Sequence, residues 1–237
     1  TVAAGIDQEA RQGADAQKFG CSEIMTASTA GNTLSSADAA IDFSAPAGLQ
    51  AVLTECADAL AGKAIIVGTT GLSDELKARI AKAAERSPII VSANYSVGVN
   101  LMLGVVASAA RVLPAERFDV EIVETHHRHK ADAPSGTALL LGSTVAEARQ
   151  GNLADVRRDG RTGHTGERPP GEVGFHAVRG GEVVGEHRVL FLGAHERFEI
   201  GHAAADRGVF AEGALLATKW LIGKAPGLYT MRDVLGL

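Results

Sequence analysis

The sequence is poor in cysteine and in long apolar runs, and each shortage argues against a class of protein. Its only cysteines, Cys21 and Cys56, form no CxxC pair, which argues against a disulfide framework or a zinc finger and favours a reducing cytoplasm. The most apolar stretch, Val97 to Leu113, is interrupted by polar residues and falls short of the roughly 20 residues of a membrane span. No basic start followed by an apolar stretch marks a secretory signal.

Neither sign of charge dominates the chain. Lys and Arg total 23 against 28 for Asp and Glu, and the formal net charge is -5. This mild acidity argues against a general nucleic-acid binder, which needs a basic face. With 46% hydrophobic and 22% charged residues over 237 positions, the chain has the composition of an ordinary globular protein with one large domain or two modest ones.

The first half alternates short apolar runs with helical patterns. Pro46 suits the start of one helix, and Ser73 is a candidate N-cap of the next. We expect strands at 2–6, 39–43, 64–67 and 89–91, and helices at 47–60 and 74–85. Strands that alternate with helices and are apolar on both faces predict a parallel sheet with helices on both sides.

The second half has a different pattern. Two runs, 175–179 and 182–192, flank Gly180-Gly181, and we expect a tight hairpin there. Further expected elements are helices at 97–112, 135–150 and 210–222 and strands at 118–123 and 197–203. The pattern predicts an α+β half with a broad antiparallel sheet, and a terminal helix that returns to cover the parallel sheet of the first half.

The densest group of polar residues lies at 124–137, where the sequence reads ETHHRHKADAPSGT. Histidine suits proton transfer near neutral pH, and Lys130 offers a fixed positive charge. A helix that begins after Ser135 presents free N–H groups that can bind a carboxylate or phosphate. A single histidine here fits a solvated loop, but the whole set favours a site for a small acid. A metal site on His127 and His129 is a lesser alternative, because nothing completes a clear ligand set.

Three segments carry weaker signals for a cofactor. The run 68–71, Gly-Thr-Thr-Gly, directly follows a predicted parallel strand, where glycines let a ligand approach the backbone. Asp7 follows the first predicted strand, where dinucleotide folds place the acid that binds the ribose hydroxyls. The segment 92–100 joins the last parallel strand to the apolar helix, and its Tyr95 can pack on a nicotinamide or on a domain interface. Each segment also fits an ordinary structural role.

Together these motifs resemble the 4-hydroxy-tetrahydrodipicolinate reductase (dihydrodipicolinate reductase) family of the diaminopimelate–lysine pathway. The run 124–137 is similar to the most specific motif of that family. Further similarity lies at 68–71, 94–100, 164–168, 185–187 and 231–235. The resemblance covers nearly the whole chain and is weakest from 9 to 37.

The resemblance implies roles for individual residues. His126 is expected to be the general acid that protonates the substrate after hydride transfer, and Lys130 its catalytic partner, whose charge stabilises developing electron density on the nitrogen or enamine. Expected substrate contacts are His127, Ser135, Gly136 and Thr137. Expected cofactor contacts are Asp7, as the ribose acid, and Gly68, Thr69, Thr70, Ser92, Ala93, Asn94 and Tyr95.

The resemblance also implies an architecture and partners. We expect an α/β fold with a Rossmann-like dinucleotide-binding domain at 1–97 and 207–237. The remaining 98–206 would form an α+β substrate-binding domain whose mostly antiparallel sheet pairs copies into a homotetramer. The family reduces a cyclic dicarboxylate to tetrahydrodipicolinate with NADH or NADPH. We expect no metal, no nucleic acid and no membrane partner, and a cytoplasmic location.

Two features depart from the family pattern. No GxGxxG loop precedes Asp7, whereas a Rossmann unit needs a first strand, that loop and a helix upstream of the ribose acid. We expect this piece to precede Thr1 in the full polypeptide, because the motifs further along the cofactor side are intact. Gln8 stands where many relatives have a basic residue for the 2′-phosphate of NADPH, so we expect a preference for NADH, although Arg11 is near.

Two alternatives belong to other classes of protein. One is a truncated relative that binds dicarboxylates at Lys130 and 135–137 without redox activity. The other is a metal-dependent hydrolase built on His126, His127 and His129.

Overall fold

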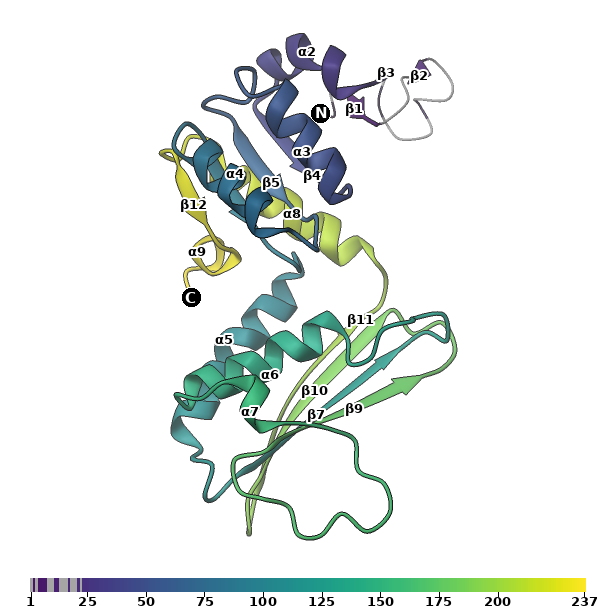
Figure 1. The fold of residues 1–237 in the computed structure, drawn as a ribbon, viewed down its shortest axis with the longest axis vertical. Helices are drawn as coiled ribbons and strands as arrows, with labels where there is room; N and C mark the ends of the chain where they lie inside the picture. The colour runs from purple at the N-terminus through teal and green to yellow at the C-terminus, as the bar shows by residue number, and fades with distance from the viewer. Residues whose placement is uncertain (1, 3, 8–10, 13–16, 18–20, 22) are drawn as a thin grey trace. The chain divides into compact units, whose positions relative to one another are not determined.

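Figure 1 shows the computed structural model of the chain, which describes residues 2, 4–7, 11–12, 17, 21 and 23–237. The contacts divide the chain into two compact units. One comprises Thr1–Tyr95 and Glu212–Gly236, and the other comprises Ser96–Ala211 with Leu237. Each unit has its own hydrophobic core.

The main sheet of the first unit is parallel, as the alternating pattern predicts. Its order is β12-β6-β5-β4, formed by Gly227–Tyr229, Pro88–Val91, Ala64–Val67 and Ala39–Asp42. Along β5, Ile65 and Val67 pack into one core cluster, whereas Ala64 and Ile66 pack into another. This alternation shows that β5 is covered on both faces, which is why its sequence is apolar throughout.

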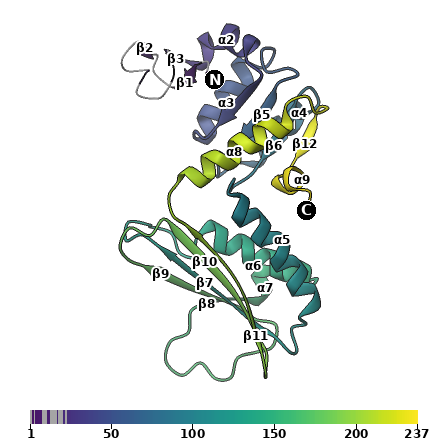
Figure 2. The same cartoon turned by 180° about the vertical axis from the view of Figure 1, so that it is seen from behind.

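Helices cover the two faces of this sheet. Helices α3 (Pro46–Glu55) and α4 (Asp74–Ala84) pack on one face, and α8 (Gly208–Leu221) packs on the other through Ala214, Ala217 and Leu221 (Figure 2). The expectation that the terminal helix covers the second face is confirmed. Oγ of Ser73 accepts a hydrogen bond from N of Leu76, which confirms the predicted N-cap of α4. The short α9 (Met231–Leu235) follows β12.

The segment before β4 forms small elements, most of which the sequence pattern does not predict. Strand β1 covers only Gly5–Ile6, shorter than the predicted 2–6, and pairs in parallel with β3 (Glu23–Met25). Strand β2 (Arg11–Gln12) pairs antiparallel on the other side of β3. A 3-10 turn, Ala27–Thr29, and α2, Gly31–Ser36, lead to β4. Strand β3 escapes prediction because Ile24 is its only buried residue.

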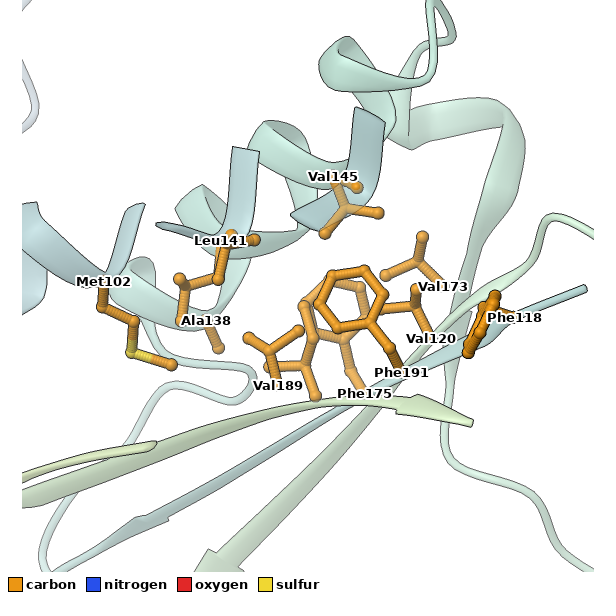
Figure 3. Packing of buried hydrophobic residues seen from close by; sticks show 13 residues of the cluster. Met102, Phe118, Val120, Ala138, Leu141, Val145, Val173, Phe175, Val189 and Phe191 are labelled. Atoms are coloured by element: carbon orange, nitrogen blue, oxygen red, sulfur yellow. The ribbon is translucent and has the colours of Figure 1, made fainter. Parts of the chain in front are cut away.

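The second unit packs helices on one face of a five-stranded sheet. Helix α5 (Val97–Val112) has the predicted bounds, and α6 (Gly136–Ala148) lies beside it, followed by the short α7 (Leu153–Val156). The sheet order is β11-β10-β7-β9-β8, formed by Arg197–Ala204, Gly185–Leu192, Asp119–His126, Val173–Arg179 and Arg157–Asp159. Figure 3 shows Leu141 and Val145 of α6 above Phe175 and Phe191 of the sheet.

The predicted hairpin across Gly180-Gly181 is wrong. Strands β9 and β10 do not pair with each other, because β7 lies between them, parallel to β9 and antiparallel to β10. The glycines bond to the end of β7 instead: N of Gly180 donates to O of His126, and N of Arg128 donates to O of Gly181. The segment thus carries the chain past the end of β7 rather than folding back. Antiparallel pairing makes up most of this sheet, with parallel pairing at β9 and β8.

Strand β7 runs further than the predicted 118–123 and ends at His126. Thr125 and His126 of the polar run 124–137 therefore lie on a strand, and the neighbouring strands of the sheet hold them in place. Among the residues that the structure describes, no helix is long and apolar enough to cross a membrane.

Candidate active site

His126 and Glu124 form the centre of the polar site in the second unit. They stand two residues apart at the end of β7, so their side chains share one face of the sheet. Nδ1 of His126 lies 2.5 Å from Oε2 of Glu124. Only 1% of Glu124 is exposed, so this carboxylate acts inside the protein rather than on its surface.

The Glu124 carboxylate is held by several donors. Nη1 and Nη2 of Arg179 donate to its two oxygens, each at 2.7 Å, and N of Ser135 donates to Oε1 at 3.1 Å. Burial raises the pKa of Glu124, but the hydrogen bonds from Arg179 and His126 outweigh it and the pKa lies below its ordinary value. An ionised carboxylate only accepts, so Nδ1 of His126 must carry a proton.

This arrangement leaves Nε2 of His126 for chemistry. A Cβ placed on Gly185 would lie 3.0 Å from Nε2, closer than ordinary van der Waals contact. Glycine at 185 therefore leaves room beside Nε2 of His126, whereas a side chain would crowd it.

Ser135 has a structural task that the sequence does not reveal. Its Oγ caps α6 by accepting from N of Ala138, and it lies 3.0 Å from Nε2 of His187. Burial, followed by the nearby His126, lowers the pKa of His187 to about 4, so this ring is neutral at pH 7. Ser135 thus contacts His187 through its hydroxyl and donates its N–H to Glu124.

Lys130 lies in the loop after β7, which Arg179 ties to the strand. Nζ of Lys130 donates to Oδ1 of Asp132 at 2.8 Å, and Nη2 of Arg179 donates to O of Asp132 at 2.7 Å. The hydrogen bond from Lys130 holds the pKa of Asp132 below its ordinary value. A continuous set of contacts therefore joins Lys130 to Glu124 and through it to His126.

The remaining predicted substrate contacts lie in the same loop and at the start of α6. A Cβ on Gly136 would meet nothing within 4 Å, so the first turn of α6 opens to space there. Thr137 follows as the second residue of α6, whose first N–H groups have no partner inside the helix. Nδ1 of His127 is buried without a partner, which is unusual unless a ligand completes it.

The alternative of a metal site has little support from the geometry. His129 is an exposed residue whose Nε2 lies 3.8 Å from Oε1 of Glu182, and Nδ1 of His126 is occupied by Glu124. Within the described part of the chain, no group of three or more His, Cys, Asp and Glu side chains could hold a metal ion.

In the first unit, the predicted cofactor residues other than Asp7 follow β5 and β6, at the carboxyl ends of these strands of the parallel sheet. Strand β5 leads into Gly68, Thr69 and Thr70, and β6 leads into 92–94. Oγ1 of Thr69 donates to the carboxylate of Asp42 at the end of β4, and Oγ of Ser92 donates to O of Asn94 at 2.7 Å. Thr70 and Ala93 are exposed at these strand ends. Open parallel sheets bind nucleotides at the carboxyl ends of their strands, so these residues fit a dinucleotide.

Two predicted cofactor residues differ from expectation in their surroundings. Only 1% of Tyr95 is exposed, and its hydroxyl lies 2.9 Å from O of Val67 and 3.2 Å from O of Ile90, both of which can accept its hydrogen. Burial raises the pKa of Tyr95, and the ring packs in the core rather than on a nicotinamide. Glycine at 68 has a packing role, because a Cβ there would lie 2.5 Å from the ring of Phe43 and would clash with it.

Asp7 is exposed at the end of β1, and its N donates to O of Met25. The expectation for Gln8 lies outside the described residues, as does the side chain of Arg11.

Sequence reasoning did not assign roles to Glu124, Arg179 and His187. The spacing of Glu124 and His126 was a usable signal, since residues i and i+2 of a strand share a face. Arg179 and His187 reach the site only through the pairing of β9 and β10 with β7. Without the register of those strands, their sequence positions carry no such signal.

Both units of the chain match known proteins. The family models described as dihydrodipicolinate reductase, N-terminus, and dihydrodipicolinate reductase, C-terminus, match residues 1–95 and 98–235. The 4-hydroxy-tetrahydrodipicolinate reductase of Caulobacter vibrioides is 51% identical over 86% of this chain and 79% of its own. That of Thiobacillus denitrificans is 51% identical over 86% and 75%.

A solved structure shows the same fold. It is the dipicolinate-bound dihydrodipicolinate reductase from Paenisporosarcina sp. TG-14, with a TM-score of 0.70 at 23% identity over 98% of this chain and 88% of that one. The family models and the curated relatives show that this chain belongs to the dihydrodipicolinate reductase family.

Proposed function

We propose that the protein reduces 4-hydroxy-tetrahydrodipicolinate (dihydrodipicolinate) to tetrahydrodipicolinate, with His126 as the proton donor. As a member of its family the chain is an NAD(P)H-dependent oxidoreductase of diaminopimelate and lysine biosynthesis. The observation that carries the residue assignment is the His126–Glu124 pair, with Nδ1 engaged by a buried carboxylate and Nε2 beside Gly185. That arrangement suits a histidine that gives up a proton from one defined nitrogen.

Each group in the second unit then has a task. The reduced nicotinamide supplies the hydride when bound. His126 donates a proton from Nε2 to the substrate, and Glu124 stabilises the imidazolium until it does so. Lys130 places positive charge where electron density develops on the substrate nitrogen or enamine, which is the role of a preorganised charge in a catalytic site.

The substrate is a cyclic dicarboxylate, and we assign its carboxylates to cationic and N–H groups. Lys130, His127 and the N–H groups of Gly136 and Thr137 are the proposed contacts. The positive end of α6 favours an anion at this position. Ser135 is a further proposed contact at the cap of α6, and its hydrogen bonds fix the first turn of that helix.

The cofactor is assigned to the first unit. The proposed contacts are Asp7 at the ribose hydroxyls, Gly68, Thr69, Thr70, Ser92, Ala93 and Asn94 at the carboxyl ends of β5 and β6, and the main chain of Tyr95. NADH is the expected preference, because Gln8 lacks the charge that would meet a 2′-phosphate. The cofactor thus binds the domain expected at 1–97 with 207–237, and the substrate binds the domain expected at 98–206.

A homotetramer in the cytoplasm completes the proposal. The face of the five-stranded sheet opposite α5 and α6 includes Val178, which is 48% exposed. An exposed apolar side chain on a sheet face is suited to pairing with a second copy. Analytical ultracentrifugation tests this, and a monomer at micromolar concentration would contradict it.

A coupled assay tests the reaction. The synthase of the pathway generates the substrate in place, and oxidation of NADH and NADPH is followed separately at 340 nm, the absorbance of reduced nicotinamides. Oxidation that depends on the synthase supports the proposal and ranks the cofactors by kcat/KM. Dicarboxylate binding without oxidation of either cofactor, with a control reductase active, would instead favour a binding scaffold. A higher kcat/KM for NADPH would contradict the expected preference.

A further inference from the structure

We propose that Arg179 is a positioning residue that acts through Glu124 to set how tightly His126 holds its proton. The inference rests on the proposed function only in giving His126 the role of proton donor. Arg179 itself lies at the end of β9, next to His126 in the pairing of β7 with β9.

One carboxylate serves two cationic groups. Oε2 of Glu124 accepts from Nδ1 of His126 at 2.5 Å and from Nη1 of Arg179 at 2.7 Å. Oε1 accepts from Nη2 of Arg179 at 2.7 Å and from N of Ser135 at 3.1 Å. Arg179 therefore competes with His126 for the charge of Glu124, and it does so in a part-buried, bidentate geometry of a kind that is among the strongest in proteins.

This competition bears directly on proton donation. A carboxylate in contact with a histidine favours the imidazolium form, whereas a nearby cation disfavours it. A general acid works best when it holds its proton neither too tightly nor too loosely at the working pH. Glu124 alone would bind the proton of His126 tightly. Arg179 offsets part of that attraction and so keeps the proton transferable.

The other titratable and charged groups near this pair come from several elements. They are His187 of β10, His202 of β11, and Lys130 and Asp132 of the loop after β7. His187 has a pKa of about 4 and adds no charge near neutral pH. Lys130 and Asp132 pair with each other at 2.8 Å, so they act on His126 as two neighbouring charges of opposite sign. Arg179 and Glu124 remain the charged groups whose contacts lead directly to His126.

Arg179 also has a mechanical task, because Nη2 donates to O of Asp132 in the loop that carries Lys130. Loss of that contact alone predicts a looser loop and weaker substrate binding. It predicts no change in the protonation of His126 in the free protein. The two roles can therefore be separated by following the His126 ring without substrate.

The experiment is an NMR titration of the histidine rings in the whole protein, with the His126 resonance assigned by its loss in His126→Gln. We expect the His126 midpoint in Arg179→Met to rise by on the order of one pH unit, and that in Glu124→Gln to fall by a similar amount. Arg179→Lys, which keeps the charge, stays near the parent. The matched control is Arg158→Met, which removes an exposed cation from β8 of the same sheet and leaves the midpoint unchanged.

The pH profile of kcat provides the second readout. The limb that reports loss of the donor proton moves to higher pH in Arg179→Met and to lower pH in Glu124→Gln. An unchanged His126 midpoint in Arg179→Met, or shifts in the same direction for both variants, overturns the inference. If Glu124→Gln does not fold, the test is the comparison of the His126 midpoint in Arg179→Met with that in Arg179→Lys. Opposite midpoint shifts in a protein that oxidises neither cofactor support the link to Arg179 and overturn the proposed function instead.

Discussion

Oγ of Ser135 lies 3.0 Å from Nε2 of His187, a buried contact between residues 52 positions apart that joins the cap of α6 to β10. Burial and the neighbouring His126 lower the pKa of His187 to about 4, so the ring is neutral in this contact near pH 7. Protonation would place a charge in the core. The buried His187 ring therefore links the stability of the second unit to pH.

We predict that stability falls as the pH is lowered from about 6.5 to about 4, the unfolded and folded pKa values of His187. In this range the unfolded chain binds a proton that the folded chain does not, so acid favours unfolding. Over the full pKa shift, the loss in the free energy of unfolding is on the order of 3 kcal/mol. Urea unfolding of the parent and of His187→Gln at several pH values measures it. The parent should lose more stability on acidification, and equal losses would contradict the prediction.

His126→Ala should lower kcat by about 10²–10⁴-fold, the usual effect of losing a general acid, with a smaller change in substrate affinity. His129→Ala is the matched control, because His129 belongs to the same loop but its side chain is 70% exposed. It should retain parent turnover. Steady-state kinetics in the coupled assay gives both values. An unchanged kcat in His126→Ala would make His126 a structural residue.

Lys130→Ala should lower kcat by roughly 10²-fold, equivalent to about 3 kcal/mol of transition-state stabilisation by a preorganised charge. Arg128→Ala removes an exposed cation from the same loop and serves as the control. Steady-state kinetics of both variants shows whether the substitution changes kcat or KM. A rise in KM with no change in kcat would show that Lys130 only binds the substrate.

Gly174→Ala should destabilise the second unit. A Cβ at 174 would lie 2.6 Å from Cδ of Glu121, whose carboxylate is held by Arg161, Arg168 and His176. Neither backbone nor carboxylate can shift without breaking these bonds, so we expect a loss of about 1–3 kcal/mol.

Gly180→Ala is the control for this substitution, because a Cβ there meets nothing within 4 Å. Its free energy of unfolding should change by no more than about 0.5 kcal/mol. Chemical denaturation compares the two variants. Similar losses in both would show that the contact with Glu121 is not the cause.

Local patterns in the sequence predicted several elements closely. Helix α5 has the predicted bounds, and β5 occupies the predicted residues 64–67. The caps at Ser73 and Ser135 are set by a hydroxyl and an N–H three residues later, which a short stretch of chain contains entirely. The run at 124–137 likewise placed His126 and Lys130 at the centre of the site, because its chemistry is contiguous in sequence.

The pairing of distant strands was decided only in the tertiary structure. Gly180-Gly181 suits a hairpin locally, but in the structure β7 lies between β9 and β10. The strand order depends on the packing of the whole sheet, which buries Phe175 and Phe191 against α6. That insertion brings Arg179 to Glu124 across 55 positions and His187 to Ser135. Sequence by itself determined which residues we propose to carry the chemistry. Strand register decided which groups surround them, because hydrogen-bonded pairing between distant segments depends on packing that no local pattern encodes.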